Sequence, residues 1–294
     1  MNKAISKLVI GSANFGLEYG LANTFGKISE TELKNILSSA EGAGVEMVDT
    51  AQAYGDSESR IGALCSDYRF RLITKISPDL KNGFVKNSLT SLVSKSCQRL
   101  NQSQLYAVML HRPEVLLGDN GSIIVNELLT LKEKGTVNKI GISIYSPEIL
   151  EELSKKIKLD IVQAPFNIFD RQLLLSGWSD KLKESGVEIH TRSVFLQGLL
   201  LMKRSILPKY FTKNWPDLFR SWYDFLSKNS ANAQVVALKF ALTQSWIDKI
   251  VVGVDSGSQL KALVEIEKSS LSLDFPRLGC DDANLINPSK WDLE

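Results

Sequence analysis

Short hydrophobic runs rich in β-branched residues alternate with longer amphipathic segments along the whole chain. The first run, Leu8–Gly11, predicts a strand, and the segment Thr31–Ala43 carries apolar residues at helical spacing. Ser29 is a suitable N-cap for this helix and Gly44 a suitable end. The chain therefore opens with a predicted strand and a predicted helix.

The same alternation continues and predicts further strand–helix units. The later predicted strands are Val45–Val48, Leu72–Lys75, Tyr106–Leu110, Lys139–Ser143, Asp160–Gln163, Glu188–Ser193 and Ile250–Gly253. The later predicted helices are Ser57–Cys65, Val85–Leu100, Ile123–Lys134, Pro147–Lys156, Leu174–Ser185, Pro216–Lys228, Ala233–Ser245 and Ser258–Glu267. Eight units of this kind indicate parallel pairing, and eight parallel strands close a barrel.

An open, doubly wound sheet is the competing architecture. A dinucleotide-binding protein of that type should carry Gly-x-Gly-x-x-Gly between its first strand and helix. The chain has Gly11-Ser-Ala-Asn-Phe-Gly16 there, without the middle glycine. No proline-rich linker or low-complexity block divides the sequence. We therefore expect an α/β protein with a (β/α)8 TIM-barrel fold, in which residues 1–294 form a single domain.

Composition limits the classes of partner. The 294 residues are 44% hydrophobic and 23% charged, and a net charge of +2 gives no reason to expect nucleic acid or a membrane as a partner. The apolar run Leu8–Ile10 is too short for a secretion signal. The cysteines Cys65, Cys97 and Cys280 lack metal-ligand spacing, so we expect no metal site. We expect a cytoplasmic monomer or small homo-oligomer that acts on a small molecule.

Four reactive side chains fall at the carboxyl ends of predicted strands, where barrel enzymes bind their substrates. Asp49 follows the second strand, and Tyr54 lies in the loop beyond it. Lys75 ends the third strand, and His111 follows the fourth. Alone, each has an ordinary structural interpretation as a loop carboxylate, a rim aromatic, a surface lysine or a hydrogen-bonded histidine. Together they predict one catalytic site.

The segments around these residues resemble the aldo-keto reductases. The segment Val48-Asp-Thr-Ala-Gln-Ala-Tyr-Gly-Asp-Ser-Glu58 is similar to a sequence block of that family. Ile73-Thr-Lys75 is similar to its third-strand lysine motif, and Leu110-His-Arg-Pro113 to its fourth-strand histidine motif. The resemblance extends to about Glu267 and leaves the C-terminal tail unmatched. It implies an NAD(P)-dependent oxidoreductase that reduces an aldehyde or a ketone by hydride transfer.

The resemblance also implies a role for each of the four residues. Hydride delivery places negative charge on the carbonyl oxygen, so the site has to supply a proton there. Tyr54 is the implied general acid. A free tyrosine ionises only at about pH 10, and Lys75, anchored by Asp49, is the cation that favours its ionisation. His111 is the implied donor that orients the carbonyl.

The nicotinamide side of the resemblance contains departures. The family holds the nicotinamide amide with a Ser-Asn pair after strand five and a glutamine that ends strand six. Ser143 and Gln163 match, but Ile144 stands at the asparagine position. Arg192 stands where the family often has a tyrosine that stacks on the ring, and its guanidinium either stacks there too or pairs with an acidic residue. The run that follows supplies two further implied cofactor contacts, Ser193 and Gln197.

The segment after the eighth strand resembles the part of the family that holds the adenosine end of the cofactor. Gly253 and Gln259 stand at the usual basic positions for the 2′-phosphate of NADP, and Asp255 lies between them. A carboxylate repels a 2′-phosphate and accepts a hydrogen bond from a ribose hydroxyl. This favours NAD(H) within the NAD(P)H pair, although Lys261 lies close enough in sequence to compensate. Ser258, at the start of the last helix, leaves backbone N–H groups for a phosphate.

The substrate and two rival functions stay open. The polar loop Leu17–Lys27 on the catalytic face suits a hydroxylated ligand. Similar proteins with the run Arg-Ser-x-Phe-Leu-Gln-Gly-Leu-Leu are associated with surface-glycan pathways, which suggests a sugar or nucleotide-sugar-derived carbonyl. In a barrel aldolase Lys75 would form a Schiff base, but that chemistry requires no cofactor segment. The other alternative is a nicotinamide-binding redox sensor module with little turnover, although the presence of all four catalytic residues disfavours an inactive protein.

Overall fold

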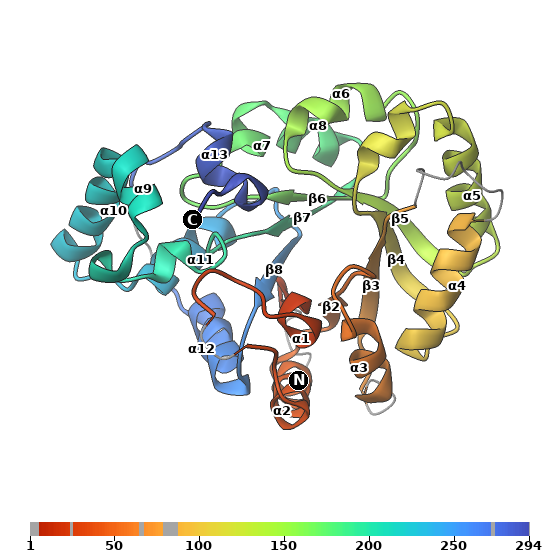
Figure 1. Ribbon diagram of the computed structural model, residues 1–294, viewed down its shortest axis with the longest axis horizontal. Coiled ribbons are helices and arrows are strands. Elements are labelled where there is room, and N and C mark those ends of the chain that lie inside the picture. The colour runs from red at the N-terminus through yellow and green to blue at the C-terminus, as the bar shows by residue number, and fades with distance from the viewer. Residues whose placement is uncertain (1–5, 24–25, 65–67, 79–87, 272–273, 294) are drawn as a thin grey trace.

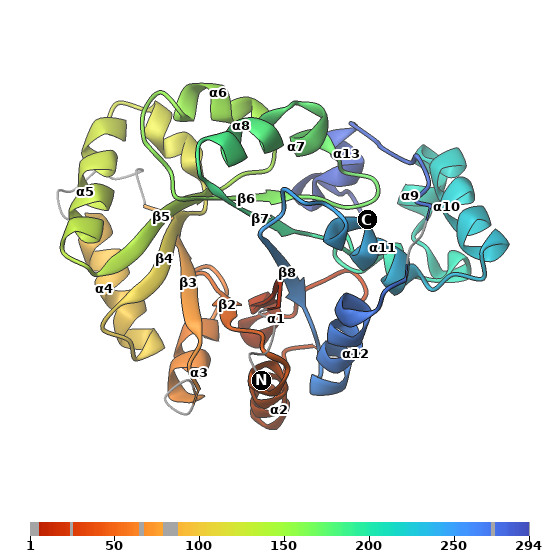
Figure 2. The same cartoon turned by 180° about the vertical axis from the view of Figure 1, so that it is seen from behind.

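The computed structural model describes residues 6–23, 26–64, 68–78, 88–271 and 274–293. Eight parallel strands pair in chain order, and the last pairs with the first to close a barrel. Figures 1 and 2 show the helices around the outside of the strands, with α9 and α10 standing out to one side next to α13. The predicted (β/α)8 barrel is confirmed, and the doubly wound sheet is excluded.

All eight predicted strands are present, and their ends differ from the prediction by two residues at most. The strands are β1 (Leu8–Gly11), β2 (Met47–Asp49), β3 (Arg71–Ile76), β4 (Leu105–Leu110), β5 (Val137–Ser143), β6 (Ile161–Pro165), β7 (Glu188–Arg192) and β8 (Lys249–Gly253). Between β8 and β1, Leu8 lies opposite Ile250 and Gly11 opposite Gly253. The carboxyl ends of β1 and β8 therefore meet at one end of the barrel.

The helices follow the prediction less closely. They are α1 (Ala13–Gly16), α2 (Glu30–Ala43), α3 (Ser57–Leu64), α4 (Ser88–Leu100), α5 (Gly121–Glu133), α6 (Leu150–Leu153), α7 (Gln172–Leu175), α8 (Trp178–Glu184), α9 (Lys209–Asn214), α10 (Pro216–Lys228), α11 (Ala233–Leu242), α12 (Gly257–Lys268) and α13 (Ala283–Ile286). The predicted helix Leu174–Ser185 is two helices, because Gly177 has a φ of +74° between them. The predicted helix Pro147–Lys156 begins as a 3₁₀ turn and ends at Leu153. Cys65 and residues 85–87 of two predicted helices lie outside the described residues.

The termini of α2 form as the sequence predicts. The Ser29 hydroxyl accepts a hydrogen bond from the Glu32 amide at 3.2 Å, and Gly44 ends the helix with a φ of +80°. The apolar face of α2 is buried, and the helix packs beside α12. This contact brings the first turns of α2 and α12 together, next to the site described below.

The core has two layers that the barrel wall separates. The larger layer lies between the strands and the surrounding helices. The smaller layer fills the barrel interior with apolar side chains contributed by alternating strand positions: Val9, Met47, Ile73, Ala107, Met109 and Ile161. Since side chains alternate along a strand, the residue two positions beyond each of these also points into the barrel, toward its carboxyl end.

Candidate functional site

Three strands place a polar side chain directly beyond the apolar interior. Asp49, Lys75 and Gln163 each come two residues after an apolar interior residue, on β2, β3 and β6. Their exposed fractions are 2%, 1% and 0%. The alternation that fills the barrel with apolar side chains therefore also gathers these buried polar groups at its carboxyl end.

These groups form a connected network that includes an ion pair. The Lys75 ammonium donates to one carboxylate oxygen of Asp49 in a short contact. The other oxygen accepts a hydrogen bond from Gln163 Nε2 at 2.8 Å, and the Ser143 hydroxyl donates to Gln163 Oε1 at 3.5 Å. Burial alone would lower the pKa of Lys75, but the attraction of the Asp49 carboxylate outweighs it and raises that pKa. The lysine is therefore cationic at neutral pH.

Two aromatic side chains lie over this ion pair. The Tyr54 ring centroid is 5.2 Å from Lys75 Nζ. The Tyr54 and His111 rings pack edge to face, with their centroids 5.9 Å apart. Burial, and after it the Lys75 charge, lowers the pKa of His111 to about 4, so its imidazole is neutral at pH 7. No hydrogen bond of the described residues engages the Tyr54 hydroxyl. We call Tyr54, Lys75, Asp49 and Gln163 the carboxyl-end cluster.

The loop that carries Tyr54 is fixed by buried polar contacts. The Ser57 hydroxyl donates to the Ser12 carbonyl at 3.0 Å, which ties the start of α3 to the loop after β1. Glu58, 2% exposed, accepts a hydrogen bond from Thr74 at 2.5 Å and pairs with Arg99 at 2.6 Å. These contacts join the Tyr54 loop to β1, β3 and α4, and they give a physical reason for the Ser-Glu of the sequence block.

A cavity of about 510 Å³ begins at the carboxyl-end cluster and runs to the first turn of α12. Most of the predicted site residues line it: Asp49, Tyr54, Gln163, Arg192, Ser193, Gln197, Gly253, Asp255 and Gln259. Lys75, Ser143 and His111 lie behind this lining, in contact with residues that form it. The structure therefore brings the predicted catalytic and cofactor residues to one cavity.

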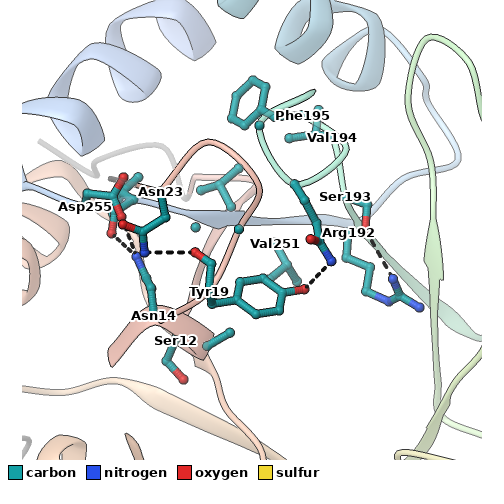
Figure 3. A pocket seen from close by; sticks show the side chains of 18 of the residues that line it. Ser12, Asn14, Tyr19, Asn23, Arg192, Ser193, Val194, Phe195, Val251 and Asp255 are labelled. Carbon is teal, nitrogen blue, oxygen red and sulfur yellow. Dashed lines mark hydrogen bonds between the residues drawn. The ribbon is translucent and has the colours of Figure 1, made fainter. Parts of the chain in front are cut away.

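Arg192 is held by a backbone carbonyl and a hydroxyl. Its guanidinium donates to the Ile144 carbonyl at 3.0 Å. It also donates to the Ser193 hydroxyl at 3.2 Å, as Figure 3 shows. It also lies 4.4 Å from the centroid of the Tyr145 ring. Within the described part of the chain, no carboxylate forms an ion pair with Arg192. The predicted pairing with an acidic residue is therefore wrong, and the backbone of Ile144 holds the guanidinium.

The loop after β7 has an unusual backbone. Ser193, Leu196 and Gln197 have φ values of +62°, +48° and +53°, which few residues other than glycine adopt. In the part of the chain that the structure describes, no hydrogen bond engages the amide N–H groups of Val194, Phe195 and Gln197. All three residues line the cavity. The loop thus offers free backbone donors of the kind that bind phosphate oxygens.

Asn14 forms the far end of the cavity together with Asp255, and the sequence did not single it out (Figure 3). Asn14 Nδ2 donates to the Asp255 carboxylate at 2.9 Å and to the Val254 carbonyl at 2.8 Å. Asn14 Oδ1 is buried and has no hydrogen-bond partner among the described residues. Such an orphaned acceptor in a cavity wall indicates a ligand donor. Its place in a polar loop beyond β1 was the available signal.

The first turn of α12 offers fewer free donors than the sequence suggested. Gly257 N–H donates to Glu32 Oε1 of α2 at 2.8 Å. The N-cap Ser256 accepts from the Gln259 amide at 3.1 Å, and Gln259 Oε1 accepts from the Asp255 amide at 2.7 Å. The Glu32 carboxylate therefore already binds a helix-terminal amide that a phosphate would otherwise use, and Asp255 stands one residue before the N-cap.

The loops after β1 and β7 meet across the mouth of the cavity. Gln197 Nε2 donates to the Tyr19 hydroxyl at 3.4 Å (Figure 3). A Cβ atom added at Gly198 would lie 2.6 Å from Ala22 Cβ, so the two loops approach as closely as a glycine permits. We call the Tyr19–Gln197 and Ala22–Gly198 contacts the loop bridge.

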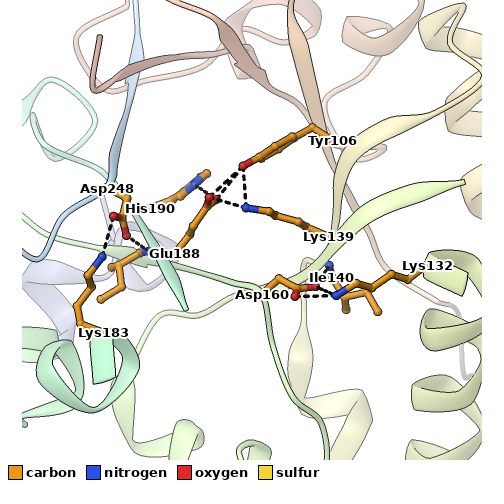
Figure 4. Close-up of polar contacts among 10 residues, drawn as sticks. Tyr106, Lys132, Lys139, Ile140, Asp160, Lys183, Glu188, His190 and Asp248 are labelled. Carbon is orange, nitrogen blue, oxygen red and sulfur yellow. Dashed lines mark hydrogen bonds and ion pairs between the residues drawn. The ribbon is translucent and has the colours of Figure 1, made fainter. Parts of the chain in front are cut away.

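A second polar cluster lies at the opposite, amino end of the barrel (Figure 4). Glu188 accepts from Lys139 Nζ at 2.5 Å and from the Tyr106 hydroxyl at 3.0 Å, and lies 3.4 Å from His190 Nε2. Burial would raise the pKa of Glu188, but the neighbouring His190 imidazole and the Lys139 ammonium outweigh it and lower that pKa to about 2. We call Tyr106, Lys139, Glu188 and His190 the amino-end cluster.

Two other kinds of site have no support in the described residues. No group of three or more His, Cys, Asp or Glu side chains is arranged there to hold a metal ion. In the same part of the chain, no helix has the length and apolar character needed to span a membrane. The cavity is therefore the candidate functional site of this protein.

Sequence comparison leads to one family. The model of the Aldo/keto reductase family matches residues 7–275. The L-glyceraldehyde 3-phosphate reductase of Escherichia coli (strain K12) is 24% identical, over 85% of this chain and 83% of that protein. The D-arabinose 1-dehydrogenase of Saccharomyces cerevisiae is 24% identical, over 96% of this chain and 89% of that protein.

Structural comparison agrees on the fold. An aldo-keto reductase from Bacillus halodurans, solved in its holo form, superposes with a TM-score of 0.73 at 22% identity. The match covers 92% of this chain and 89% of that one. Since the family model extends over most of the sequence, the chain belongs to the aldo/keto reductase family of oxidoreductases.

Proposed function

We propose that this protein reduces an aldehyde or a ketone with a nicotinamide dinucleotide, and that Tyr54 supplies the proton. The observation that carries the proposal is the Tyr54 hydroxyl, which has no partner among the described residues and belongs to a residue that lines the cavity next to the buried Lys75–Asp49 pair. A hydroxyl beside a fixed cation is arranged to give up a proton. An aldolase function, in which Lys75 would form a Schiff base, has less support because the ammonium is already paired with Asp49.

The cavity fits a nicotinamide dinucleotide. The free amide groups of Val194, Phe195 and Gln197 would face its phosphates, and the orphaned Asn14 Oδ1 with Asp255 would face the adenosine ribose. A Cβ atom at Gly253 would meet nothing within 4 Å, so the wall there leaves open space. When bound, the reduced nicotinamide supplies a hydride. Gln163, Arg192 and Ser193 would hold the ring end, next to Tyr54.

The chain's own residues would handle the proton. Tyr54 would donate it to the carbonyl oxygen, and Lys75 would stabilise the tyrosinate that remains. Asp49 and Gln163 would keep the ammonium in place through their hydrogen bonds. The neutral His111, whose pKa is lowered to about 4, would donate an N–H to the same carbonyl oxygen and orient the substrate.

The helix terminus at the adenosine end favours NAD(H) over NADP(H). The Glu32 carboxylate accepts from the Gly257 amide in the first turn of α12, and the Asp255 carboxylate, bonded to Asn14, belongs to the residue before the N-cap. A 2′-phosphate would meet these charges at short range, which is unfavourable. Lys261 is exposed on the following part of the helix. We therefore propose NADH as the preferred reductant.

The substrate we propose is a sugar-derived carbonyl. Two relatives are named for reactions of glyceraldehyde 3-phosphate and of arabinose. Polar side chains of the loop after β1, Tyr19 and Asn23, line the cavity and suit a hydroxylated compound. A sugar or nucleotide-sugar intermediate of a surface-glycan pathway, reduced in the cytoplasm by a monomer or small homo-oligomer, fits these features.

The first experiment is a titration of the purified protein with NADH and with NADPH, followed by tryptophan fluorescence. Saturable binding of NADH, tighter than that of NADPH, is expected. The Glu32→Gln variant should bind NADPH more tightly, by about tenfold for each 1.4 kcal/mol of repulsion removed. Glu30→Gln, which removes an exposed charge from the same helix, is the matched control.

Each outcome of this titration has a separate meaning. Absence of binding by folded protein would overturn the proposed function. Tighter binding of NADPH would overturn only the preference for NADH. Binding of either cofactor, with no oxidation of NADH across a panel of sugar aldehydes and ketones, would support the redox sensor module instead.

A further inference from the structure

Arg192 places a cation in the cavity wall that forms no ion pair with a carboxylate of the described residues. Its hydrogen bonds go to the Ile144 carbonyl and the Ser193 hydroxyl, and its flat face lies on Tyr145. All three partners are uncharged groups. The guanidinium is protonated at any physiological pH. The charge is therefore fixed in position and permanent.

The other ionisable groups at this end do not fully compensate that positive charge. Lys75 and Asp49 cancel each other as an ion pair. His111 is neutral, since its pKa is lowered to about 4. Asp170, 1% exposed, accepts a hydrogen bond from the Gln172 amide. Burial raises its pKa to about 7, against the opposing effects of that hydrogen bond and of Arg192, so the carboxyl is about half ionised at neutral pH and offsets only part of the Arg192 charge. The net charge around this part of the cavity is accordingly positive.

The reacting ring has to lie beside Arg192 if the proposed function holds. In carbonyl reduction the hydride goes to the carbonyl carbon and the proton to the adjacent oxygen. A ring that delivers the hydride therefore lies within a few ångströms of the proton donor, Tyr54. Asp49, Gln163, Arg192 and Ser193 line the same cavity as Tyr54. Among these, Arg192 alone carries a charge that is not paired within the described residues. The charge of Arg192 acts on both Lys75 and His111, which lie against the Tyr54 ring.

The two forms of a nicotinamide cofactor differ by one charge at the ring. The reduced ring is neutral. Loss of a hydride, with its electron pair, leaves a ring with one positive charge, while the carbonyl becomes an alcohol with the proton of Tyr54. A cation in a cavity wall repels a second cation strongly, because the local dielectric constant is low.

We propose that Arg192 makes this cavity select the reduced nicotinamide dinucleotide over the oxidised one. The inference rests on the proposed function and adds a specificity that neither the family nor the relatives' names supply. A site with this preference takes the reduced cofactor from a mixed pool. It also releases the oxidised product quickly, which limits product inhibition.

The test is a set of equilibrium dissociation constants, measured by calorimetry with NADH alone and with NAD⁺ alone. For the wild type, the ratio of the NAD⁺ constant to the NADH constant should be at least about tenfold, equivalent to about 1.4 kcal/mol. Arg192→Gln, which removes the charge, should lower the ratio toward one, chiefly by tighter NAD⁺ binding. Arg192→Lys, which keeps the charge, should retain most of it.

The control is Arg112→Gln, which removes the same charge from an exposed residue whose field also reaches His111. The ratio should stay at the wild-type value in this variant. An unchanged ratio in Arg192→Gln would overturn the inference, as would equal loss of affinity for both forms. A wild-type ratio near one would overturn it even if Arg192→Gln failed to fold. Binding of neither form to the folded wild type would instead overturn the proposed function.

Discussion

Both ends of this barrel hold a tyrosine, a lysine and a carboxylate in contact, yet only the carboxyl end combines them with a cavity and an unbonded hydroxyl among the described residues. In the amino-end cluster the Tyr106 hydroxyl bonds to both Glu188 and Lys139, so every charged group there has an internal partner (Figure 4). In the carboxyl-end cluster the Lys75–Asp49 pair is equally satisfied, but the Tyr54 hydroxyl has no partner among the described residues, and Tyr54 faces the cavity. Residue types alone therefore do not define a site. What distinguishes the reactive end is one polar group left available beside a fixed charge.

The largest difference in stability between the two clusters should appear when one lysine is removed from each. Lys75→Met leaves the Asp49 carboxylate buried without its cation and should lower the free energy of unfolding by about 3–5 kcal/mol. Lys139→Met affects a pair that is 29% exposed and should cost only about 1 kcal/mol. Urea denaturation of both variants measures the difference. Equal losses would show that the two ion pairs are energetically alike.

The second test removes one hydroxyl from each end. Tyr54→Phe should reduce the rate of carbonyl reduction by about 10²–10³-fold, because the proton donor is lost. The dissociation constant of NADH should remain unchanged. Tyr106→Phe should leave the rate unaltered and cost about 1 kcal/mol of stability, since it breaks a satisfied hydrogen bond. Single-turnover kinetics with calorimetry separate these effects, and a rate loss of similar size in both variants would contradict the comparison.

The smallest effects concern pH, and the two ends should respond in different ranges. Glu188 has a pKa lowered from 4.5 to about 2, so its stabilising contribution is complete above pH 4.5 and is lost as pH falls toward 2. His111 has a pKa lowered from 6.5 to about 4, so protonation of the unfolded chain reduces stability as pH falls from 6.5 toward 4. Each effect is on the order of 1 kcal/mol.

Two variants separate these pH ranges. Glu188→Gln should weaken the pH dependence of unfolding below 4.5 by the share of this one carboxyl and leave the range above it intact. His111→Gln should do the reverse. Denaturant midpoints measured across the whole range decide the matter, and a His111→Gln curve that coincides with the wild type would show that this histidine is not buried as a neutral group.

The sequence predicts the frame of this site well because the frame depends on short-range periodicity. The eight strands follow from alternation, and the convergence of Asp49 and Lys75 follows from parallel strands that end together. The break at Gly177 was not predicted, because a glycine within a helical pattern is compatible with either outcome until its φ is known. Local pattern therefore gives the positions of strands more securely than the interruptions of helices.

Contacts between distant segments were the part that the sequence could not supply. Glu32 reaches Gly257 only because α2 packs beside α12, and nothing near either residue signals the other. The partners of Arg192 depend on the conformation of a long side chain, and in the structure its guanidinium bonds to the Ile144 carbonyl. Asn14 was not predicted as a site residue because it lies in α1, a short helix that the sequence did not lead us to expect.

The loop bridge has a kinetic consequence. The loops after β1 and β7 meet over the cavity, joined by the long Tyr19–Gln197 hydrogen bond and by the close packing of Gly198 on Ala22. A ligand as long as a dinucleotide enters or leaves such a cavity when the bridge parts. Association should then saturate at high ligand concentration, at the rate at which the bridge opens, and residence time should follow the same step. The strength of the exposed Tyr19–Gln197 hydrogen bond would thus influence the rate at which cofactor is exchanged during turnover.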